Sequence, residues 1–327
     1  MIKILLAFVV AFVVGVAVGP FVVWFMKKEK AKQTILHYVE AHVGKQGTPT
    51  LGGVIFLIAA GISCAIFLRG STRLALVSLA ITFAYALLGF FDDFVKIKMK
   101  QNLGLRPWQK IVFQVIVAAL VSVFVFLSAD VGTKIEIPFA HIFLDLKWGI
   151  IPFTIFVFLA CTNAVNLTDG LDGLASLTTL VCLVCFCALL IVSSALKQST
   201  ETFSLIIFAV AICGGLLAFL CFNSYPAKIF MGDTGSMALG AVVACVGIFS
   251  RTSLFILFFG APFVASAVSV VLQVAYYKKT KKRIFLMAPL HHHFEKRGVH
   301  ETKIVAIYGI VSFMIGLITL LFQFIGR

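Results

Sequence analysis

Two adjacent aspartates, Asp92 and Asp93, lie where a long apolar run ends in the stretch GFFDDFVK (89–96). The run covers residues 74–91 and has the length of a membrane span. Two neighbouring carboxylates repel each other unless a cation lies close to them. Ionisable groups are costly to place near membrane depth, so the pair predicts a functional site with a cation nearby.

A second group of polar residues follows in NAVNLTDGLDG (163–173). Asp169 and Asp172 are three residues apart, and residues at this spacing share one face of a helix. We expect them to begin a span with Thr168 as its N-cap, where the helix N-terminus favours carboxylates and could attract a phosphate. Asn166 adds an amide close by. An ordinary capped helix start is the alternative, but it accounts for one polar residue rather than several.

A third motif, NSYPAKIFMGDTGS (223–236), places Asp233 between Gly232 and a Thr-Gly-Ser turn that opens the next span. Glycine permits backbone angles that direct successive N–H groups at an anion. Mg²⁺ prefers oxygen ligands and usually takes one or two carboxylates together with substrate phosphates, so Asp233 is a candidate ligand. Phe230 could stack on a planar base, although packing is the alternative for one phenylalanine in so apolar a chain.

Three consecutive histidines stand in APLHHHFEKRG (288–298), within the most basic loop of the chain. Consecutive residues of a regular element do not face one point, which disfavours a three-histidine metal site. Their position suits phosphate contact or pH-sensitive proton donation. His291, His292 and His293 are therefore candidate site residues.

The stretch GKQGTPTLGG (44–53) brings a lysine, two threonines and several glycines to the start of an apolar segment. Lys45 and Thr50 are candidate substrate contacts there. A flexible loop without a role in binding is the alternative.

The elements that must position these residues are membrane helices. Of the 327 residues, 61% are hydrophobic and 12% are charged, and the mean hydropathy is +1.09. A soluble domain of this composition could not cover its surface, which excludes the soluble globular class. A spanning helix needs about 20 apolar residues. Candidate spans cover residues 2–26, 50–68, 73–91, 111–128, 148–165, 173–196, 202–222, 235–250, 253–277 and 304–325.

These ten segments predict an all-α integral membrane protein that forms a single polytopic domain over residues 1–327. The first apolar run is too long for the core of a signal peptide and lacks a clear cleavage site, so we expect it to be the first span. With the N-terminus outside, most of the 27 lysines and arginines fall on one side of the membrane, which the positive-inside rule places in the cytoplasm. Both termini then lie outside.

Most of the net charge of +14 is therefore carried by lysines and arginines at the cytoplasmic ends of the spans. These side chains contact anionic lipid headgroups and could also attract a polyanionic substrate. Because all five motifs lie on the same side, we expect the active site at the cytoplasmic face, with the lipid bilayer as a partner and no nucleic acid.

The outer side of the membrane carries less chemistry. Its one sizeable loop (129–147) alternates apolar with charged residues in KIEIPF and IFLDLKW, which predicts a small β-hairpin. We expect Asp130, Glu136, His141 and Asp145 to be solvated loop residues. The eight cysteines fall within or at the ends of spans, where we expect them to fill space rather than to form disulfides or a zinc site.

Together the motifs predict a phosphoryl transfer. Carboxylates near the membrane suggest a divalent cation, glycine turns at helix starts suggest phosphates, and cytoplasmic lysines suggest a polyanion. A site at membrane level suggests a lipid phosphate as acceptor. The reaction that fits is transfer from a nucleotide-linked donor to a lipid phosphate, with Mg²⁺ neutralising charge in the transition state.

The same motifs resemble those of the polyprenyl-phosphate sugar-1-phosphate transferases over essentially the whole chain. Paired aspartates such as Asp92 and Asp93, and the Asn-x-x-Asp-Gly pattern in NAVNLTDGLDG, resemble the wider family. TPTLGG and PLHHHFE resemble its muramoyl-pentapeptide branch more narrowly. The resemblance implies a donor, UDP-N-acetylmuramoyl-pentapeptide, and an acceptor, undecaprenyl phosphate, with lipid I and UMP as products of this step of peptidoglycan synthesis in the bacterial inner membrane.

The resemblance also implies roles for individual residues. Asp233 would hold Mg²⁺, Asp92 or Asp93 would act on the lipid phosphate, and His291 is expected with them among the catalytic residues. The implied substrate contacts are Lys45, Thr50, Lys96, Asn166, Asp169, Gly170, Leu171, Asp172, Asn223, Phe230, Gly232, Gln273, His292 and His293. By analogy the ninth span is bent and the enzyme forms a homodimer. Lys110 is not among these contacts, since the lysine-rich segment after Asp93 is short.

Three other functions fit parts of the pattern. A sister transferase that uses UDP-N-acetylglucosamine would share the chemistry and differ in the donor. An ion-coupled transporter also has many spans with intramembrane carboxylates, although here these cluster at one face rather than at the midplane. A membrane oxygenase or hydrolase would need several separated histidine clusters, and the sequence has one.

Overall fold

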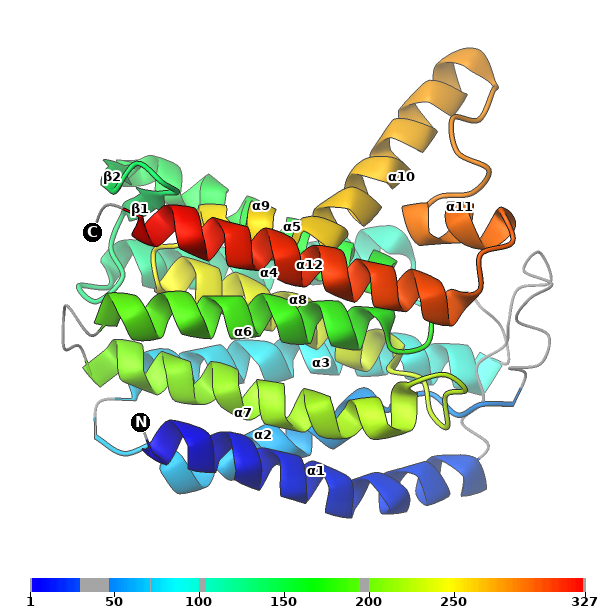
Figure 1. Ribbon diagram of the computed structural model, residues 1–327, viewed down its shortest axis with the longest axis horizontal. Helices are drawn as coiled ribbons and strands as arrows, with labels where there is room; N and C mark the ends of the chain where they lie inside the picture. The colour runs from blue at the N-terminus through cyan, green and yellow to red at the C-terminus, as the bar shows by residue number, and fades with distance from the viewer. Residues whose placement is uncertain (1, 30–46, 71, 100–103, 195–199, 326–327) are drawn as a thin grey trace.

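The computed structural model describes residues 2–29, 47–70, 72–99, 104–194 and 200–325. Over these residues the chain forms a bundle of long helices and one two-stranded sheet (Figure 1). Among the described helices, nine are long and apolar enough to cross a membrane. These are α1 (Ile2–Lys28), α3 (Arg73–Met99), α4 (Pro107–Leu127), α5 (Ile150–Thr168), α6 (Leu174–Ser194), α7 (Thr200–Asn223), α8 (Gly232–Phe249), α10 (Ala261–Thr280) and α12 (Glu301–Phe324).

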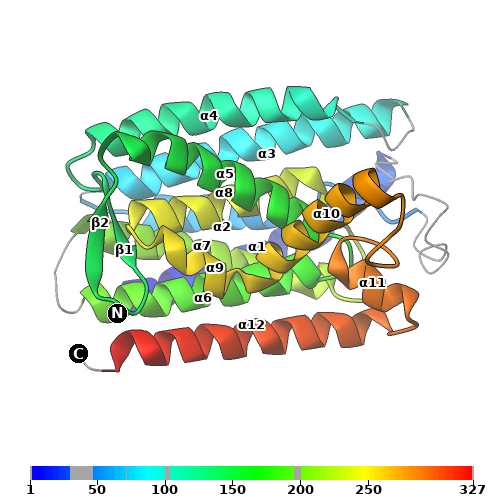
Figure 2. The same ribbon diagram turned by 90° about the horizontal axis from the view of Figure 1, so that it is seen from above.

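Helix α2 (Gly53–Phe67) supplies a tenth crossing. Its 15 residues make it about 22 Å long, shorter than the roughly 30 Å of the hydrocarbon core. The two termini nevertheless lie at the same end of the bundle in both views (Figures 1 and 2), which requires an even number of crossings. The helix begins later than predicted because the segment before it pairs with another part of the chain, as described below. The predicted all-α membrane fold is confirmed.

Helix α8 forms the centre of the bundle. Nearly all of its side chains are buried, and it packs mainly against α3 and α5 (Figure 2). Glycines allow this close approach, because a Cβ atom at Gly240 would collide with the backbone of Thr162 on α5, and one at Gly89 on α3 would collide with the backbone of Asp233. Small residues are typical of helix contacts in membranes, where packing rather than water exclusion drives association. The packing brings the ends of α3, α5 and α8 together.

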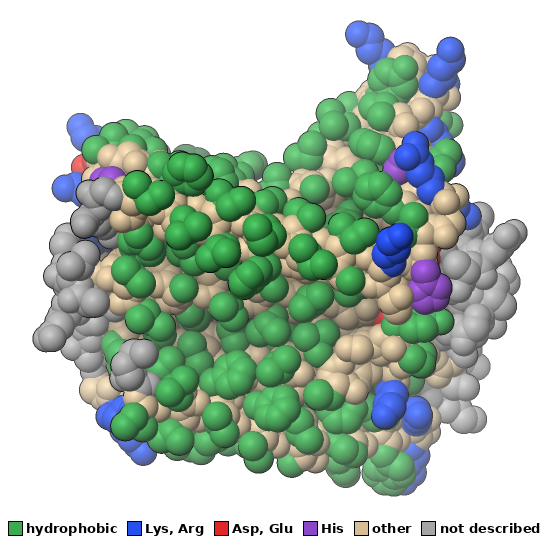
Figure 3. Space-filling view, in the orientation of Figure 1, with side chains coloured by type: hydrophobic (Ala, Val, Ile, Leu, Met, Phe, Trp, Pro, Cys, Tyr) green, Lys and Arg blue, Asp and Glu red, His purple; other side chains and the backbone are tan. Residues whose placement is uncertain are grey.

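The outside of the bundle is suited to lipid. Apolar side chains cover the middle of the face seen in Figure 3, and lysines and arginines lie toward its ends. Backbone groups in a bilayer must bond within the protein, and long helices meet that requirement. All eight cysteines are free and all but Cys221 are buried, as expected for residues that fill space.

The predicted span over residues 253–277 is interrupted near its start. It divides into a 3₁₀ turn (Ser253–Phe255), a short helix α9 (Ile256–Phe259) and α10, which begins after Gly260. Pro262 lies in the first turn of α10, where its missing N–H costs nothing, but it could not continue α9 without losing a hydrogen bond. Helix α10 then leaves the bundle obliquely (Figure 1), which confirms the expected bend.

The predicted hairpin is present as β1 (Lys134–Ile137) and β2 (Ile142–Asp145), paired antiparallel at the same end of the bundle as the termini. Asp145 is exposed, as expected. The expectation that Glu136 is solvated is wrong: its side chain is buried and accepts a 2.8 Å hydrogen bond from Gln323 of α12. The hairpin therefore fastens the end of α12 to the bundle.

Replacement of Gly240 by alanine tests the central packing. The added methyl group would force α5 and α8 apart at Thr162, and overpacking of this kind costs about 1–3 kcal/mol. Gly61→Ala on α2 is the control, because its nearest neighbour, a Phe83 ring carbon, lies 3.7 Å from the added Cβ. We expect Gly240→Ala to lower the unfolding temperature of the detergent-purified protein and Gly61→Ala to leave it unchanged or raise it. Equal temperatures for both variants would contradict this account.

Candidate active site

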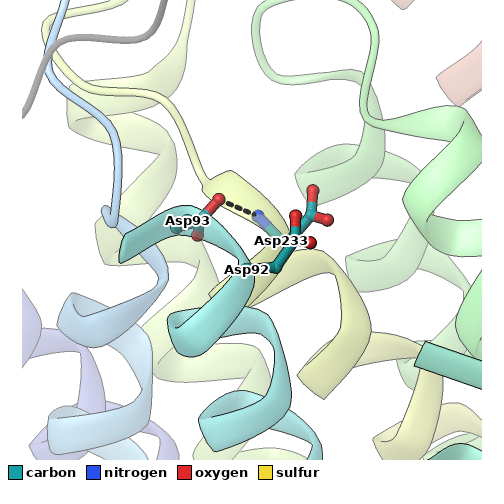
Figure 4. A group of neighbouring side chains, drawn as sticks. All are labelled: Asp92, Asp93 and Asp233. Atoms are coloured by element: carbon teal, nitrogen blue, oxygen red, sulfur yellow. Dashed lines mark hydrogen bonds between the residues drawn. The ribbon is translucent and has the colours of Figure 1, made fainter. Parts of the chain in front are cut away.

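Three carboxylates meet at the end of the bundle opposite the termini. Asp92 and Asp93 lie on the last turns of α3, and Asp233 lies in the first turn of α8 (Figure 4). One carboxylate oxygen from each lies within 4.8 Å of the others. The close approach of α3 to α8 at Gly89 sets this arrangement, which brings together residues 140 positions apart in the chain.

Two lysines neutralise much of this charge. Lys96 Nζ lies 2.7 Å from Asp92 Oδ2 and 3.3 Å from Asp233 Oδ2. Lys110 Nζ, on α4, lies 2.9 Å and 2.7 Å from the same two oxygens. Both lysines remain about one-fifth exposed, so the centre is open on their side. The nearby cation that the aspartate pair predicted is thus provided in part by the protein.

Asp92 is wholly buried and both of its oxygens have neighbours. The backbone N–H of Leu105, just before α4, donates a 2.7 Å hydrogen bond to Oδ1, and the two lysines surround Oδ2. Asp92 therefore ties together the ends of α3 and α4.

Asp93 faces a different set of groups. Its Oδ1 accepts a hydrogen bond from the backbone N–H of Asp233 (3.1 Å; Figure 4), and its Oδ2 accepts from the N–H (2.9 Å) and hydroxyl (2.8 Å) of Thr234. The two members of the aspartate pair are thus distinct: Asp92 lies 2.7–2.9 Å from two lysines, whereas Asp93 bonds to the start of α8 and lies 3.9 Å from Lys96.

Asp233 is the most accessible of the three carboxylates, with 15% of its side chain exposed. Its Oδ1 accepts a 3.1 Å hydrogen bond from Asn166 on α5, whose amide also donates to Ser236. Asn166, which was predicted only as a substrate contact, thus bonds directly to Asp233. Helix α8 begins at Gly232, somewhat earlier than the predicted span.

Asp169 and Asp172 do not begin a helix, and that prediction is wrong. Helix α5 ends at Thr168, whose hydroxyl donates back to Ala164 rather than capping α6, and α6 starts at Leu174. Both aspartates lie in the turn between these helices. Burial and the neighbouring carboxylates, Asp233 foremost among them, raise the pKa of Asp169 to about 8. A cation bound at the centre would lower the pKa of Asp169.

Two predicted substrate contacts hold the loop between α7 and α8 in place. Asp172 accepts a 3.0 Å hydrogen bond from the N–H of Ala227. Asn223 is buried, accepts from the Ser176 hydroxyl and donates to the carbonyl of Ile229. These bonds fix the loop that leads to Phe230 and Asp233.

The segment before α2 pairs with the end of this loop. The N–H of Phe230 donates to the carbonyl of Pro49, and the N–H of Gly52 donates to the carbonyl of Phe230, both at 2.8 Å. The pairing places Thr50, which is buried, beside Gly232. Lys45 lies outside the described residues.

The histidines lie on α11 (Leu290–Lys296), which covers the turn between α5 and α6. His291 is buried, and a side chain at Gly170 would collide with its ring. His292 Nδ1 lies 2.8 Å from Glu295, and His293 Nδ1 accepts from the N–H of Leu286. The rings of His291 and His292 lie 4.3 Å apart and both face Gly170, whereas His293 bonds elsewhere, so the three histidines do not face one point, as predicted.

Gln273 is engaged with the chain itself. Its oxygen accepts hydrogen bonds from the N–H groups of Ile284 and Phe285, each at 3.0 Å, and its amide donates to the carbonyl of Phe285. Ser269, one turn earlier on α10, accepts from the N–H of Leu290. These bonds hold the connection from α10 to α11, so Gln273 positions α11 relative to α10.

An apolar groove of about 390 Å³ lies between α5 and the α9–α10 bend. Phe156, Ala160 and Ala164 line one wall, and Leu257, Val264 and Val268 line the other. Ala164 is two residues from Asn166, so the groove leads toward the carboxylates. Its lining is suited to an aliphatic chain.

Lys110 is the residue that the sequence analysis left out of the site although the structure places it at its centre. The position of Lys110 at the start of α4, just after Pro107, could have indicated its role. Since α4 follows α3 closely in the chain, it begins at the end of the bundle where α3 ends, beside Asp92. Thr234 was also overlooked, since it reads as part of a turn until Asp93 is placed opposite it.

The fold and the site define an integral membrane protein with a carboxylate–lysine centre at one end of its helix bundle. Residues 74–251 match the model of glycosyl transferase family 4. Proteins named phospho-N-acetylmuramoyl-pentapeptide-transferase are similar over nearly their whole length. The protein of Clostridium novyi is 41% identical over 313 residues (94% of this chain, 93% of the relative). The protein of Clostridium perfringens (strain 13) is 43% identical over 311 residues (95% of each chain), and that of Bacillus velezensis is 37% identical over 309 residues (93% of each chain).

The chain therefore belongs to glycosyl transferase family 4, in the group that these transferases form. The resemblance drawn from the motifs is confirmed.

Replacement of Lys110 by methionine tests the charge balance of the centre. Removing this cation leaves Asp92 and Asp233 with Lys96 alone, at a cost of about 1–3 kcal/mol, between the values for exposed and fully buried ion pairs. We expect a lower unfolding temperature and a larger stabilisation by added Mg²⁺ than in the unaltered protein. Lys98→Met, at an exposed position on α3, is the control. A Lys110→Met protein as stable as the control would contradict the ion pairing.

Proposed function

We propose that this protein transfers phospho-N-acetylmuramoyl-pentapeptide from UDP-N-acetylmuramoyl-pentapeptide to undecaprenyl phosphate, giving lipid I and UMP in peptidoglycan synthesis. The observation that carries the proposal is the meeting of Asp92, Asp93 and Asp233 with Lys96 and Lys110 at one end of a membrane bundle. Similarity over nearly the full length to proteins named phospho-N-acetylmuramoyl-pentapeptide-transferase supports the same reaction.

The carboxylate centre suits Mg²⁺. Its donors are oxygens, which this ion prefers, and Asp233 is the carboxylate with an exposed fraction through which a ligand could approach. Asp233 would hold the ion, with substrate phosphates completing the ligand set. Mg²⁺ would supply charge neutralisation on the donor's diphosphate as the leaving UMP takes up negative charge.

Lys96 and Lys110 would also neutralise negative charge on the substrate phosphates. Their side chains are partly exposed beside the centre, and a phosphate arriving there would replace some of the contacts they now make with carboxylates. Positively charged groups placed in advance lower the cost of bringing two anionic substrates together.

The donor's nucleotide would lie between Phe230 and the turn that joins α5 to α6. The half-buried ring of Phe230 offers a stacking face for a planar base. Further contacts would come from Asn166, Asp169, the Gly170–Leu171 backbone, Lys45, Thr50, His291 and His292. Asp172, Asn223 and Gln273 would act through the loops that they hold.

The acceptor's chain would occupy the groove between α5 and α10, with its phosphate at the carboxylate centre. A phosphate monoester has a second pKa near 6, so at neutral pH it is mostly dianionic and already nucleophilic. Asp92 is wholly buried, and lysines and an N–H group surround its oxygens, which favours an orienting or proton-accepting role over attack on the donor. Direct attack by the lipid phosphate is therefore the mechanism that we favour.

The same proposal includes location and assembly. The site would face the cytoplasm from a bacterial inner membrane, since its end of the bundle carries Lys27, Lys28 and Lys98 as well as the two central lysines. Homodimer formation remains part of the proposal by analogy with the family.

The first test offers purified protein two donors with undecaprenyl phosphate and Mg²⁺, and follows UMP release. We expect UMP from UDP-N-acetylmuramoyl-pentapeptide, none from UDP-N-acetylglucosamine, and loss of release on chelation. UMP from the glucosamine donor alone would assign the protein to the sister reaction. UMP from neither donor, with an active control enzyme in the same detergent, would overturn the transferase proposal and favour transport.

Replacement of Asp92 by asparagine distinguishes the two mechanisms. Asparagine cannot form a phospho-aspartate, but its oxygen can still accept the Leu105 N–H. With direct attack by the lipid phosphate, we expect turnover to fall about 10²- to 10⁴-fold yet stay measurable, the range for loss of one acid–base group. Complete loss, together with a trapped phospho-enzyme in the unaltered protein, would establish the covalent route.

A further inference from the structure

The start of α8 lacks a cap of its own. No side chain of α8 or of its N-cap residue, Met231, accepts a hydrogen bond from its first N–H groups. These groups have no partner within the helix, and they are costly to leave unbonded when buried. Gly232 and Thr234 are buried at this helix start, so water is a poor substitute.

Asp93 of α3 supplies the missing acceptor from a neighbouring helix. Its two oxygens take the N–H groups of Asp233 and Thr234 and the Thr234 hydroxyl, at 2.8–3.1 Å. A carboxylate at a helix N-terminus is also favoured by the helix dipole. Only 3% of Asp93 is exposed. Its hydrogen bonds all go to the start of α8 (Figure 4), while Lys96 lies farther away, with Nζ 3.9 Å from Oδ1.

The surrounding backbone leaves little room for any other arrangement. Gly232 has a φ of +73°, and a Cβ atom there would lie 2.5 Å from Asp93 Oδ2 and 2.7 Å from the Thr50 hydroxyl. A Cβ at Gly89, one turn before Asp93, would collide with the backbone of Asp233. The two glycines therefore let the carboxylate reach the helix start directly.

We infer that Asp93 and Thr234 form an inter-helix cap that positions Asp233, so that Asp93 is a positioning residue for the proposed transfer and does not contact substrate. The cap fixes the first turn of α8, and Asp233 is part of that turn. The kinetic part of this inference rests on the proposed function. The structural part, coupling of Asp93 to Thr234, does not.

Thr234 offers the test, because its hydroxyl donates to Asp93. Thr234→Val keeps the shape and removes the donor, and Thr234→Ser keeps the donor. If the cap positions Asp233, Thr234→Val lowers kcat about ten- to hundredfold, the scale expected for slight misplacement of a reacting group, and Thr234→Ser restores it to within about twofold. Thr234→Ala provides a second removal of the hydroxyl if the valine variant does not fold.

The pH dependence separates positioning from direct participation. With Asp93→Asn, the remaining activity should keep the midpoints of the unaltered enzyme's pH–rate profile, because the carboxylate removed is not the one that exchanges a proton with substrate. Loss of a limb of that profile in Asp93→Asn, or full activity in Thr234→Val, would overturn the inference.

Stability measurements test the cap without any reaction. Unfolding temperatures of Asp93→Asn, Thr234→Val and the double variant form a cycle, and contacting residues give effects that do not add. We expect the double variant to be little worse than the more damaging single change. Additive losses would show that the residues act separately and would overturn the cap, whereas absence of UMP release with a coupled cycle would overturn the proposed function alone.

Discussion

The structure depends on the contact between the last turns of α3 and the first turn of α8. Three carboxylates at this point would repel one another, and the chain offsets the repulsion with two lysines and with the N-terminus of a helix. The arrangement is specific because each oxygen has an assigned neighbour. Asp92 faces lysines and Asp93 faces N–H groups, while Asp233 keeps an exposed fraction.

Other parts of the site are attached to this contact. Asn166 bonds to Asp233 from α5, and the segment before α2 pairs with the loop that leads into α8. Gln273 bonds to the segment before α11 and so holds it against α10. The position of the histidines on α11 therefore depends on α10, the helix that borders the groove. The carboxylate centre is therefore connected to α5, to the segment before α2 and to the loop that leads into α8, although its charged groups come from α3, α4 and α8 alone.

Composition and the length of the apolar runs were sufficient to predict the long helices, because the length and hydropathy of a span are constrained by the bilayer alone. The motif positions predicted the cluster of Asp92, Asp93 and Asp233 for a similar reason: carboxylates at span ends have few structural uses. The errors concern local geometry. Asp169 and Asp172 suit a helix start by spacing, yet the chain needs a turn there to reverse between α5 and α6.

Individual roles could not be predicted because they depend on contacts between distant residues. Nothing in the sequence distinguishes Asp92 from Asp93, since the difference lies in which neighbour each side chain meets across a helix contact. Lys110 became a central residue only when the start of α4 was placed beside α3. Glu136 is charged and lies in a hairpin, but Gln323 from the far end of the chain buries it.

The central position of α8 also bears on how the protein is made. The long helices that surround it, α2, α3, α5, α6 and α7, all precede it in the chain. Since proteins are synthesised from the N-terminus, these neighbouring helices can pack together before α8 leaves the ribosome. Insertion of α8 then completes the carboxylate centre, and α10, α11 and α12 are added to a site whose carboxylates already face Lys96 and Lys110.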